Sequence, residues 1–189
     1  MSVTVRPVTI RPATVADLPA LGAMAASLVR LHHGIDPARF FLANGVEEGY
    51  RKWLGRELGA GEAIVLVAET AEGAVAGYAY GRIEERDWNM LLDRHAALHD
   101  VFVAEGARRS EVGRALVERF CALVHERGVP RVVLHTAASN APAQALFSKL
   151  GFRTTMLEMT CELAPRPHSG TGPSRGTSEG SPEPTSSRE

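Results

Sequence analysis

A turn rich in arginine is the part of the sequence best suited to bind an anion. It lies between an apolar run and the helical pattern that follows, and it holds three arginines, Arg108, Arg109 and Arg114. The N-terminus of a helix offers N–H groups without partners and the positive end of the helix dipole, and Gly113 would let a ligand approach the backbone closely. The segment therefore indicates a phosphate or pyrophosphate site. An ordinary turn that carries solvated arginines is the alternative.

The apolar periodicity predicts the elements that position this turn. Alternating or continuous apolar runs predict strands, and apolar residues three and four apart predict helices. Thr14 and Asp17 form a pair similar to a capping box at the start of the first helix. The strands are expected at 8–11, 63–69, 75–86, 98–103, 131–136 and 152–162, and the helices from about 15, at 46–58, at 112–127 and at 141–150.

This order predicts an α/β (α+β) protein with a mixed, mostly antiparallel central sheet and helices on both faces. The runs at 63–69, 75–86 and 98–103 are expected to form an antiparallel meander. The run at 98–103, the next helix and the run at 131–136 form a βαβ unit, whose two strands are parallel. Ligands of such sheets bind at the turn from strand to helix where strands diverge, and the arginine-rich turn has that position.

The composition is that of one soluble globular domain, because 44% of the 189 residues are apolar and 23% are charged. A net charge of -1 supplies no field for generic binding to nucleic acid or to an anionic membrane. Cys121 and Cys161 cannot build a disulfide framework, and residues 1–12 hold no secretion signal, so a cytoplasmic location is expected. No apolar run approaches the length of a membrane span.

The composition changes after Leu163, which predicts a folded domain at 1–163 and a disordered tail at 164–189. The tail contains no Val, Ile, Leu, Phe, Tyr or Trp. It cannot bury enough apolar surface to offset the entropy that ordering would cost.

Four segments together resemble the GCN5-related N-acetyltransferase (GNAT) family. In the family's cofactor signature Arg108 takes the first position and Gly113 the last, while Glu111 stands where the family usually has Gly. Residues 140–152 look like the family's second signature, and residues 10–13 and 99–103 are also similar to the family. The segments follow the family's order over residues 8–152.

The resemblance implies a fold of the acyl-CoA N-acyltransferase type and acetyl-CoA as co-substrate, with no metal. The pyrophosphate is expected on backbone N–H groups of the turn, and the pantetheine arm is expected to pair with residues 101–103 like an extra strand. Asn140 is expected to hydrogen-bond this arm and to cap the helix that follows. A bulky residue at position 113 is expected to block the cofactor and to leave the fold intact. The expected cofactor residues are Val101, Phe102, Val103, Arg108, Arg109, Ser110, Glu111, Val112, Gly113, Arg114, Asn140 and Phe147.

The resemblance also implies that a neutral amine attacks the thioester directly. His99 is the expected catalytic base, because the family often has Glu there and His titrates near neutral pH; an ordinary packed strand residue is the alternative. The N–H of Val101 is the expected donor to the thioester oxygen. Strand alternation places Asp100 on the face opposite to His99, so Glu84 and Glu85 are the reserve bases.

The expected function is acetyl transfer from acetyl-CoA to a primary amine of a small molecule or peptide. Phe147 stands where many family members have the Tyr that protonates the departing thiolate; its loss is not expected to abolish activity, and Ser148 or water is the expected substitute. Phe147 and Glu111 favour the alternative, a non-catalytic acyl-CoA-binding or regulatory module. A homodimer is a further option, and neither a nucleic acid nor a membrane is an expected partner.

Overall fold

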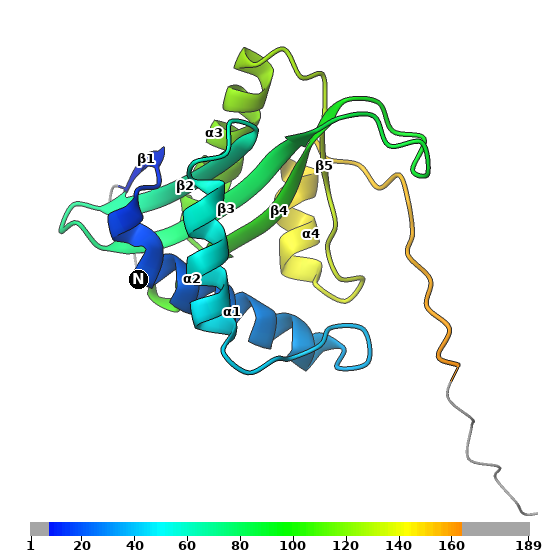
Figure 1. The fold of residues 1–189 in the computed structure, drawn as a ribbon, viewed down its shortest axis with the longest axis horizontal. Helices are drawn as coiled ribbons and strands as arrows, with labels where there is room; N and C mark the ends of the chain where they lie inside the picture. The colour runs from blue at the N-terminus through cyan, green and yellow to red at the C-terminus, as the bar shows by residue number, and fades with distance from the viewer. Residues whose placement is uncertain (1–7, 164–189) are drawn as a thin grey trace, which may run out of the picture. The chain divides into compact units, whose positions relative to one another are not determined.

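The computed structural model describes residues 8–163, and its centre is a five-stranded sheet with the strand order β1-β2-β3-β4-β5 (Figure 1). Strands β1 to β4 are antiparallel to their neighbours, and β5 runs parallel to β4. The predicted meander, the βαβ unit and the mixed, mostly antiparallel sheet are therefore confirmed. The strands are β1 (Val8–Pro12), β2 (Ala63–Thr70), β3 (Val75–Glu84), β4 (His95–Val103) and β5 (Val132–Leu134).

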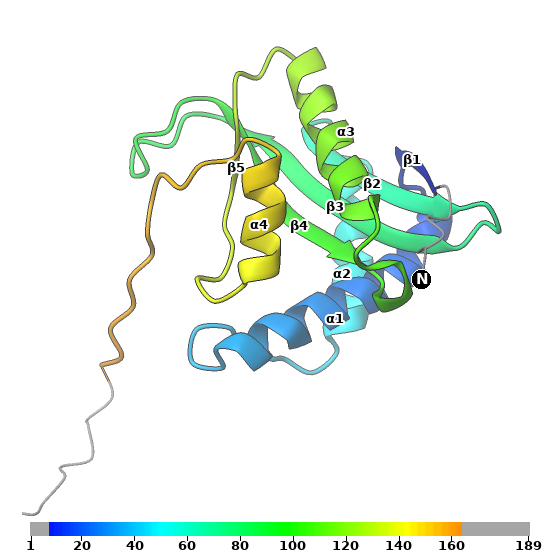
Figure 2. The same cartoon turned by 180° about the vertical axis from the view of Figure 1, so that it is seen from behind.

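Helices lie on both faces of the sheet, as predicted. One face is covered by α1 (Leu18–Ile35) and α2 (Val46–Glu57), and the other by α3 (Val112–Glu126) and α4 (Ala141–Lys149), as the two opposite views show (Figures 1 and 2). Two short 3-10 turns, η1 (Val15–Asp17) and η2 (Glu105–Ala107), precede α1 and α3. Among residues 8–163, every helix is too short or too polar to cross a lipid bilayer.

A partly buried ion pair holds the start of α1 against the first strand. The backbone N–H of Thr14 donates to Asp17 Oδ2 at 2.7 Å, which confirms the predicted capping box. Arg11 donates to both oxygens of Asp17, at 2.8 and 2.9 Å, and also contacts Glu69. The hydrogen bonds from Arg11 are the main reason that the pKa of Asp17 is lowered to about 2.

The two faces of the sheet bury different kinds of side chain. The core under α3 and α4 is built from aliphatic residues around Leu116 and Phe120. The core under α1 and α2 contains the buried rings of Tyr78 and Tyr80. Among the described residues, the buried polar side chains are Asp17, Glu57, His95 and Asp100.

Gly81 is needed where β3 passes close to both β4 and α3. A Cβ at this position would lie 2.4 Å from the carbonyl oxygen of Ala97 and 2.5 Å from Cζ of Phe120. Contacts this short force backbone or a packed ring to move. The absence of a side chain therefore lets Phe120 pack directly on the sheet.

The predicted last strand at 152–162 is wrong. The structure describes this segment without a strand, and Met156, Leu157 and Met159 are 66%, 81% and 92% exposed. The compact unit ends at Leu157, and Glu158 begins a separate one. An apolar alternation predicts an extended conformation, but a strand also needs a partner for its backbone groups. The predicted tail at 164–189 lies outside the described residues and stays a prediction.

Candidate active site

The edge of β4 is open over its second half. β5 pairs with β4 only from Ala96 to Leu98, and among the described residues no strand follows on that side. The N–H of Ala104 donates to the carbonyl oxygen of Ala76 at 2.9 Å, so Ala104 directs its main-chain groups toward β3. This bond shows which residues of β4 face β3 with their main-chain groups and which face away from it. In an antiparallel ladder every second residue directs its main-chain groups away from the partner strand.

This alternation separates the three residues that were predicted to pair with a pantetheine arm. Val101 and Val103 direct their N–H and C=O groups toward the open edge. Phe102 directs its main-chain groups toward β3, and its ring is buried in the α1/α2 core. Two of the three expected residues therefore present backbone groups at the open edge.

The arginine-rich turn leads from this edge to the N-terminus of α3. Arg109 adopts a left-handed conformation with φ 60°, which is uncommon for a residue with a side chain. Ser110 Oγ accepts from the N–H of Val112 at 3.4 Å and donates to the carbonyl oxygen of Ala107. Glu111 has φ -73°, so its Cβ causes no strain where the family has Gly.

Two of the three arginines in the turn already contact groups of the protein. Arg108 lies over the ring of Phe102 at 5.7 Å, and its Nε donates to the carbonyl oxygen of Val103 at 3.3 Å. Arg114 pairs with Glu118 at 2.8 Å and with Glu111 at 3.4 Å. The positive charge that the sequence indicated is therefore partly balanced by the carboxylates of α3.

Gly113 lies where α3 packs against α4, and the expectation that a bulky residue there leaves the fold intact stays a prediction. Gly113 is buried, and a Cβ there would lie 3.3 Å from Leu146 Cδ2 and 3.5 Å from Val103 Cγ2. A larger side chain would require Leu146 to move. The glycine therefore also has a packing role, so a test of cofactor binding with a bulky substitution needs a measurement of stability beside it.

A β-bulge brings His99 and Asp100 to the same face of the sheet, which corrects the predicted alternation. Tyr80 pairs with Asp100 and Gly81 pairs with Leu98, so His99 is the extra residue. The His99 ring stacks on Tyr80, with 5.5 Å between centroids and 22° between planes. The side chain of His99 is 42% exposed, so a ligand can reach it.

Asp100 is buried beside this exposed histidine. Its Oδ2 accepts a hydrogen bond of 2.9 Å from the hydroxyl of Tyr78. Burial raises the pKa of Asp100, and the hydrogen bond from Tyr78 and the nearby His99 and His32 oppose that effect. The bulge therefore carries two titratable side chains, one exposed and one enclosed.

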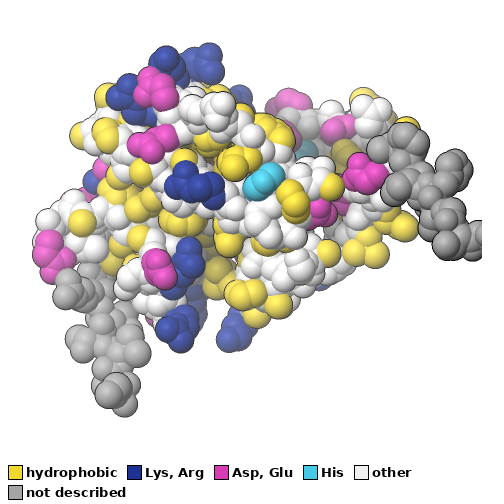
Figure 3. All heavy atoms as spheres, turned by 90° about the horizontal axis from the view of Figure 1, so that it is seen from below, with side chains coloured by type: hydrophobic (Ala, Val, Ile, Leu, Met, Phe, Trp, Pro, Cys, Tyr) yellow, Lys and Arg dark blue, Asp and Glu magenta, His cyan; other side chains and the backbone are white. Residues whose placement is uncertain are grey.

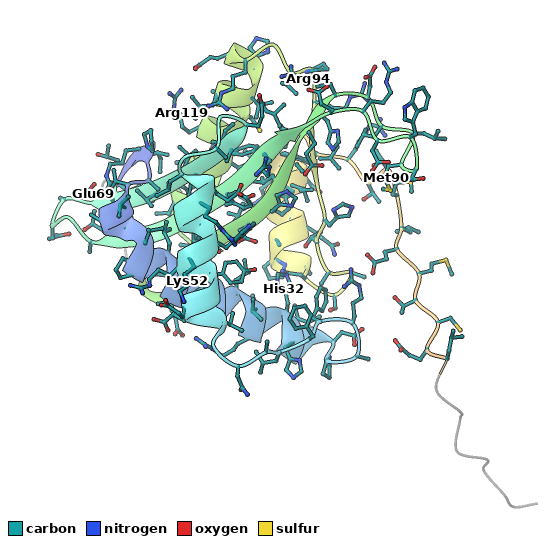
Figure 4. All side chains as sticks on the ribbon, in the orientation of Figure 1. His32, Lys52, Glu69, Met90, Arg94 and Arg119 are labelled. Atoms are coloured by element: carbon teal, nitrogen blue, oxygen red, sulfur yellow. The ribbon has the colours of Figure 1, made fainter. Side chains whose placement is uncertain are left out.

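The two reserve bases lie in different surroundings. Glu84 Oε1 is 3.4 Å from His99 Nε2, so Glu84 belongs to the site. Glu85 is 84% exposed and pairs with Arg94 at 3.2 Å on the β3–β4 hairpin, whose tip carries Met90 (Figure 4). Only Glu84 is close enough to act together with His99.

Aromatic rings from α2 and β3 form a wall next to His99. The ring centroid of Trp53 lies 4.7 Å from that of Tyr80 and 5.4 Å from that of Tyr50, and both pairs have edge-to-face geometry. The hydroxyl of Tyr80 donates to Glu57 Oε2 at 2.8 Å, and Arg82 donates to the same oxygen at 2.6 Å. Burial and the bond to Glu57 raise the pKa of Tyr80.

Sequence reasoning missed the part that Glu57 plays in this wall. A signal was present, because every second residue of β3 is polar or phenolic within an otherwise apolar strand. These residues are Tyr78, Tyr80, Arg82 and Glu84. Such an alternation indicates a face with hydrogen-bonding partners.

The residues of the second signature lie on α4. Asn140 Oδ1 accepts from the N–H of Ala143 at 3.3 Å, so its predicted capping role is confirmed. Phe147 packs on Phe152, with 5.7 Å between ring centroids. Gly151 ends the helix with φ 87°, a conformation that favours glycine.

A hollow of about 420 Å³ lies between α1 and the arginine-rich turn. Small side chains on α1 make room for it opposite the ring of Phe102. Viewed from the side of α1, basic side chains stand among apolar ones (Figure 3). The hollow is lined by Ala20, Ala23, Met24, Ser27, Phe102, Ala104, Glu105 and Arg108.

Comparisons with known proteins agree with this arrangement. Over 90 residues the chain is 33% identical to mycothiol acetyltransferase of Saccharomonospora viridis, which covers 47% of this chain and 29% of that protein. Over 92 residues it is 34% identical to the ribosomal protein bS18-alanine N-acetyltransferase of Escherichia coli. This match covers 49% of this chain and 57% of that protein. The chain thus spans less than two thirds of these relatives.

The fold is also that of solved structures. A mutant BH1408 protein from Bacillus halodurans matches with a TM-score of 0.72 at 18% identity, over 82% of this chain and 99% of that one. The family model described as the acetyltransferase (GNAT) family matches residues 30–152, which contain the open edge of β4, the arginine-rich turn and α4. The chain therefore belongs to the GNAT acetyltransferase family.

Proposed function

We propose that this protein is an N-acetyltransferase that moves an acetyl group from acetyl-CoA to a primary amine of a small molecule or peptide. The observation that carries the proposal is the open edge of β4. There, Val101 and Val103 present main-chain donors and acceptors directly before the N-terminus of α3. An extended arm that ends in a pyrophosphate matches such an edge followed by a helix N-terminus.

The co-substrate would be held mainly by main-chain groups. Val101 and Val103 would pair with the pantetheine arm, and the N–H groups at the start of α3, including those of Gly113 and Arg114, would bind the pyrophosphate. Arg109 is exposed and adds positive charge there. Glu111 lowers the net charge of the turn but leaves its own N–H group in place.

The chemistry assigned to the chain is general-base catalysis at the bulge. The amine nitrogen forms a bond to the thioester carbonyl carbon and gives a proton to His99, and the bond from carbon to sulfur then breaks. The N–H of Val101, at the open edge, would donate to the oxygen on which negative charge develops. Since Phe147 has no hydroxyl, the departing thiolate takes its proton from water.

The class of acceptor follows from the wall beside His99 and from the relatives. The partly exposed ring of Trp53 packs on Tyr80, which in turn stacks on His99, so an amine with an apolar body fits this side of the site. The matched relatives are named for mycothiol and for an alanine of ribosomal protein bS18. A small molecule or peptide amine is consistent with both.

Thermal unfolding with and without acetyl-CoA tests the co-substrate. A ligand at about 100 times its dissociation constant adds roughly 2.7 kcal/mol to the stability of the folded state. We expect a dose-dependent rise in Tm with acetyl-CoA and a smaller one with ADP, which lacks the pantetheine arm. No rise at millimolar acetyl-CoA would overturn the proposal.

A second function is favoured by Phe147, which packs on Phe152 and supplies no proton donor. It is the binding of acyl-CoA without turnover, as in a sensor or regulatory module. Release of the CoA thiol in the presence of a panel of small amines and N-terminal peptides distinguishes the two functions. Binding without thiol release across the panel would favour the module.

A further inference from the structure

One carboxylate lies between two histidines at the root of the β3–β4 hairpin. Glu84 Oε1 is 3.4 Å from His99 Nε2, and Glu84 Oε2 is 3.4 Å from His95 Nε2. We propose that Glu84 is a positioning residue, which keeps the hydrogen of His99 on Nε2 and so leaves Nδ1 to accept the proton of the attacking amine. This inference rests on the proposed function, because it assigns Glu84 a part in the same reaction.

The backbone explains why the three side chains meet. Glu84 is the last residue of β3 and lies opposite His95 in the ladder, so both point to the same face. The bulge turns His99 to that face as well, where its ring stacks on Tyr80. The imidazole of His99 is therefore held at its face by a ring and at its edge by a carboxylate.

His95 lies on the buried side of the Glu84 carboxylate. It is 4% exposed, and its Nδ1 lies 3.0 Å from the carbonyl oxygen of Asp93. A carbonyl oxygen only accepts, so Nδ1 of His95 carries a hydrogen. With its hydrogen on Nδ1, neutral His95 has a lone pair on Nε2 and donates nothing to Glu84 Oε2, so the carboxylate is left to accept from His99 through Oε1.

The proton balance of the step follows from this geometry. A neutral imidazole has one N–H and one lone pair, and the partner of one nitrogen decides which nitrogen carries the hydrogen. With Nε2–H directed at Glu84, the lone pair is on Nδ1. When Nδ1 takes the proton of the amine, His99 becomes a cation beside the Glu84 carboxylate, and the proton later leaves to water. A carboxylate also orients the histidine of a catalytic triad, but there it contacts Nδ1, whereas Glu84 faces Nε2 of His99.

The first experiment observes the tautomer of His99 and needs no turnover. Long-range nitrogen–proton NMR spectra of the imidazoles distinguish Nδ1–H from Nε2–H, and a His99→Gln spectrum assigns the signal. We expect neutral His99 to be mainly Nε2–H in the wild type and in Glu85→Ala, and to become a mixture in Glu84→Ala. A tautomer that is Nδ1–H in the wild type, or unchanged in Glu84→Ala, would overturn the proposal.

Glu85→Ala is the matched control because Glu85 is the next residue, is also a glutamate, and pairs with Arg94 instead of a histidine. Glu84→Gln is the conservative variant. It keeps the size of the side chain and one accepting oxygen, so it should retain part of the Nε2–H preference. Equal behaviour of Glu84→Gln and Glu84→Ala would show that charge, and not hydrogen bonding, holds the tautomer.

The second experiment compares two amines that differ in basicity, ethylamine and trifluoroethylamine. Ethylamine is mostly protonated at neutral pH, whereas trifluoroethylamine is mostly neutral and needs less help from a base. We expect Glu84→Ala to lower kcat for ethylamine by about 10- to 30-fold with little change in KM, and for trifluoroethylamine by less than about 3-fold. An equal loss with both amines would show a merely structural role.

The two experiments separate this inference from the proposed function. If no amine is acetylated and acetyl-CoA does not bind, the proposed function fails, whatever the NMR spectra show. If acetylation occurs and the tautomer of His99 does not depend on Glu84, the positioning role fails and the function stands.

Discussion

The two faces of the central sheet differ in what they bury. Under α3 and α4 the core is mostly aliphatic, and Phe120 and Leu116 are fully buried in it. Under α1 and α2 the core contains Tyr78 and Tyr80, whose hydroxyls bond to buried carboxylates. Burial of a polar group destabilises a protein unless the group is hydrogen-bonded. One face is therefore packed with apolar side chains, and the other holds hydrogen-bonded polar groups in fixed positions beside His99.

The largest effect that this comparison predicts comes from the aliphatic face. Phe120→Ala removes a fully buried ring that packs on Gly81, and we expect it to lower the free energy of unfolding by about 3–5 kcal/mol. Urea unfolding measures this loss. Arg119→Ala, on the exposed side of the same helix, is the control and should change stability by less than about 0.5 kcal/mol. A small loss for Phe120→Ala would show that the two faces contribute alike.

A smaller effect is expected on the polar face. Tyr78→Phe removes the hydroxyl that donates to Asp100 and should cost about 2–3 kcal/mol near neutral pH, because a charged group stays buried without this partner. Burial already raises the pKa of Asp100, and the lost hydrogen bond raises it further. Since a carboxyl group with a raised pKa stabilises the fold less as pH increases, the cost should be smaller at pH 5 than at pH 8.

The variant with both changes, Tyr78→Phe and Asp100→Asn, is the control for this prediction. It removes the buried charge, so the dependence of the loss on pH should disappear. A loss of stability that is independent of pH in Tyr78→Phe alone would mean that the hydroxyl acts through packing only.

The stability cost of Asp17→Asn should depend on pH in the opposite direction. Its largest value should be somewhat smaller than that of Tyr78→Phe. The pKa of Asp17 is lowered to about 2 by Arg11, so its contribution is present above the ordinary pKa of Asp and is lost as pH falls through about 2. Asp17→Asn should therefore cost about 1–2 kcal/mol at pH 7 and almost nothing near pH 2. Acid unfolding of both proteins measures this difference. An equal cost at the two pH values would show that the ion pair contributes little.

The smallest effect is expected from a hydroxyl added to the aliphatic side. Phe147→Tyr should change the affinity for acetyl-CoA by less than about threefold, because the ring is kept and the added hydroxyl would act on the departing thiolate of the proposed reaction. Binding is measured by titration calorimetry, and turnover by release of the CoA thiol. A tenfold loss of affinity would show that the packing of Phe147 on Phe152 supports the cofactor edge.

The sequence was enough to predict the fold and most of its elements. Apolar periods of two and of three to four residues located the strands and helices, and the capping pair at Thr14 marked the start of the first helix. The predicted strand at 152–162 failed because periodicity does not show whether a partner strand exists. The domain limit at 163, the homodimer and the cytoplasmic location remain predictions.

The site was harder to predict than the fold. Motif positions located the open edge and the turn, but the extra residue at His99 leaves no mark in the apolar pattern, so Asp100 was assigned to the wrong face. The contacts of Arg108 and Arg114 depend on side chains that come together only in the folded chain. Gly113 was explained by the ligand alone, although its neighbours Leu146 and Val103 also require it.

The bulge has a consequence for how this protein can change during evolution. Because His99 is an additional residue, two consecutive side chains of β4 serve one face, while Leu98 and Val101 continue to serve the other. Loss of one residue here would restore regular alternation and leave the aliphatic core in register. The chemistry at this position can therefore vary by insertion, deletion or substitution without a matching change in the core that keeps the protein folded.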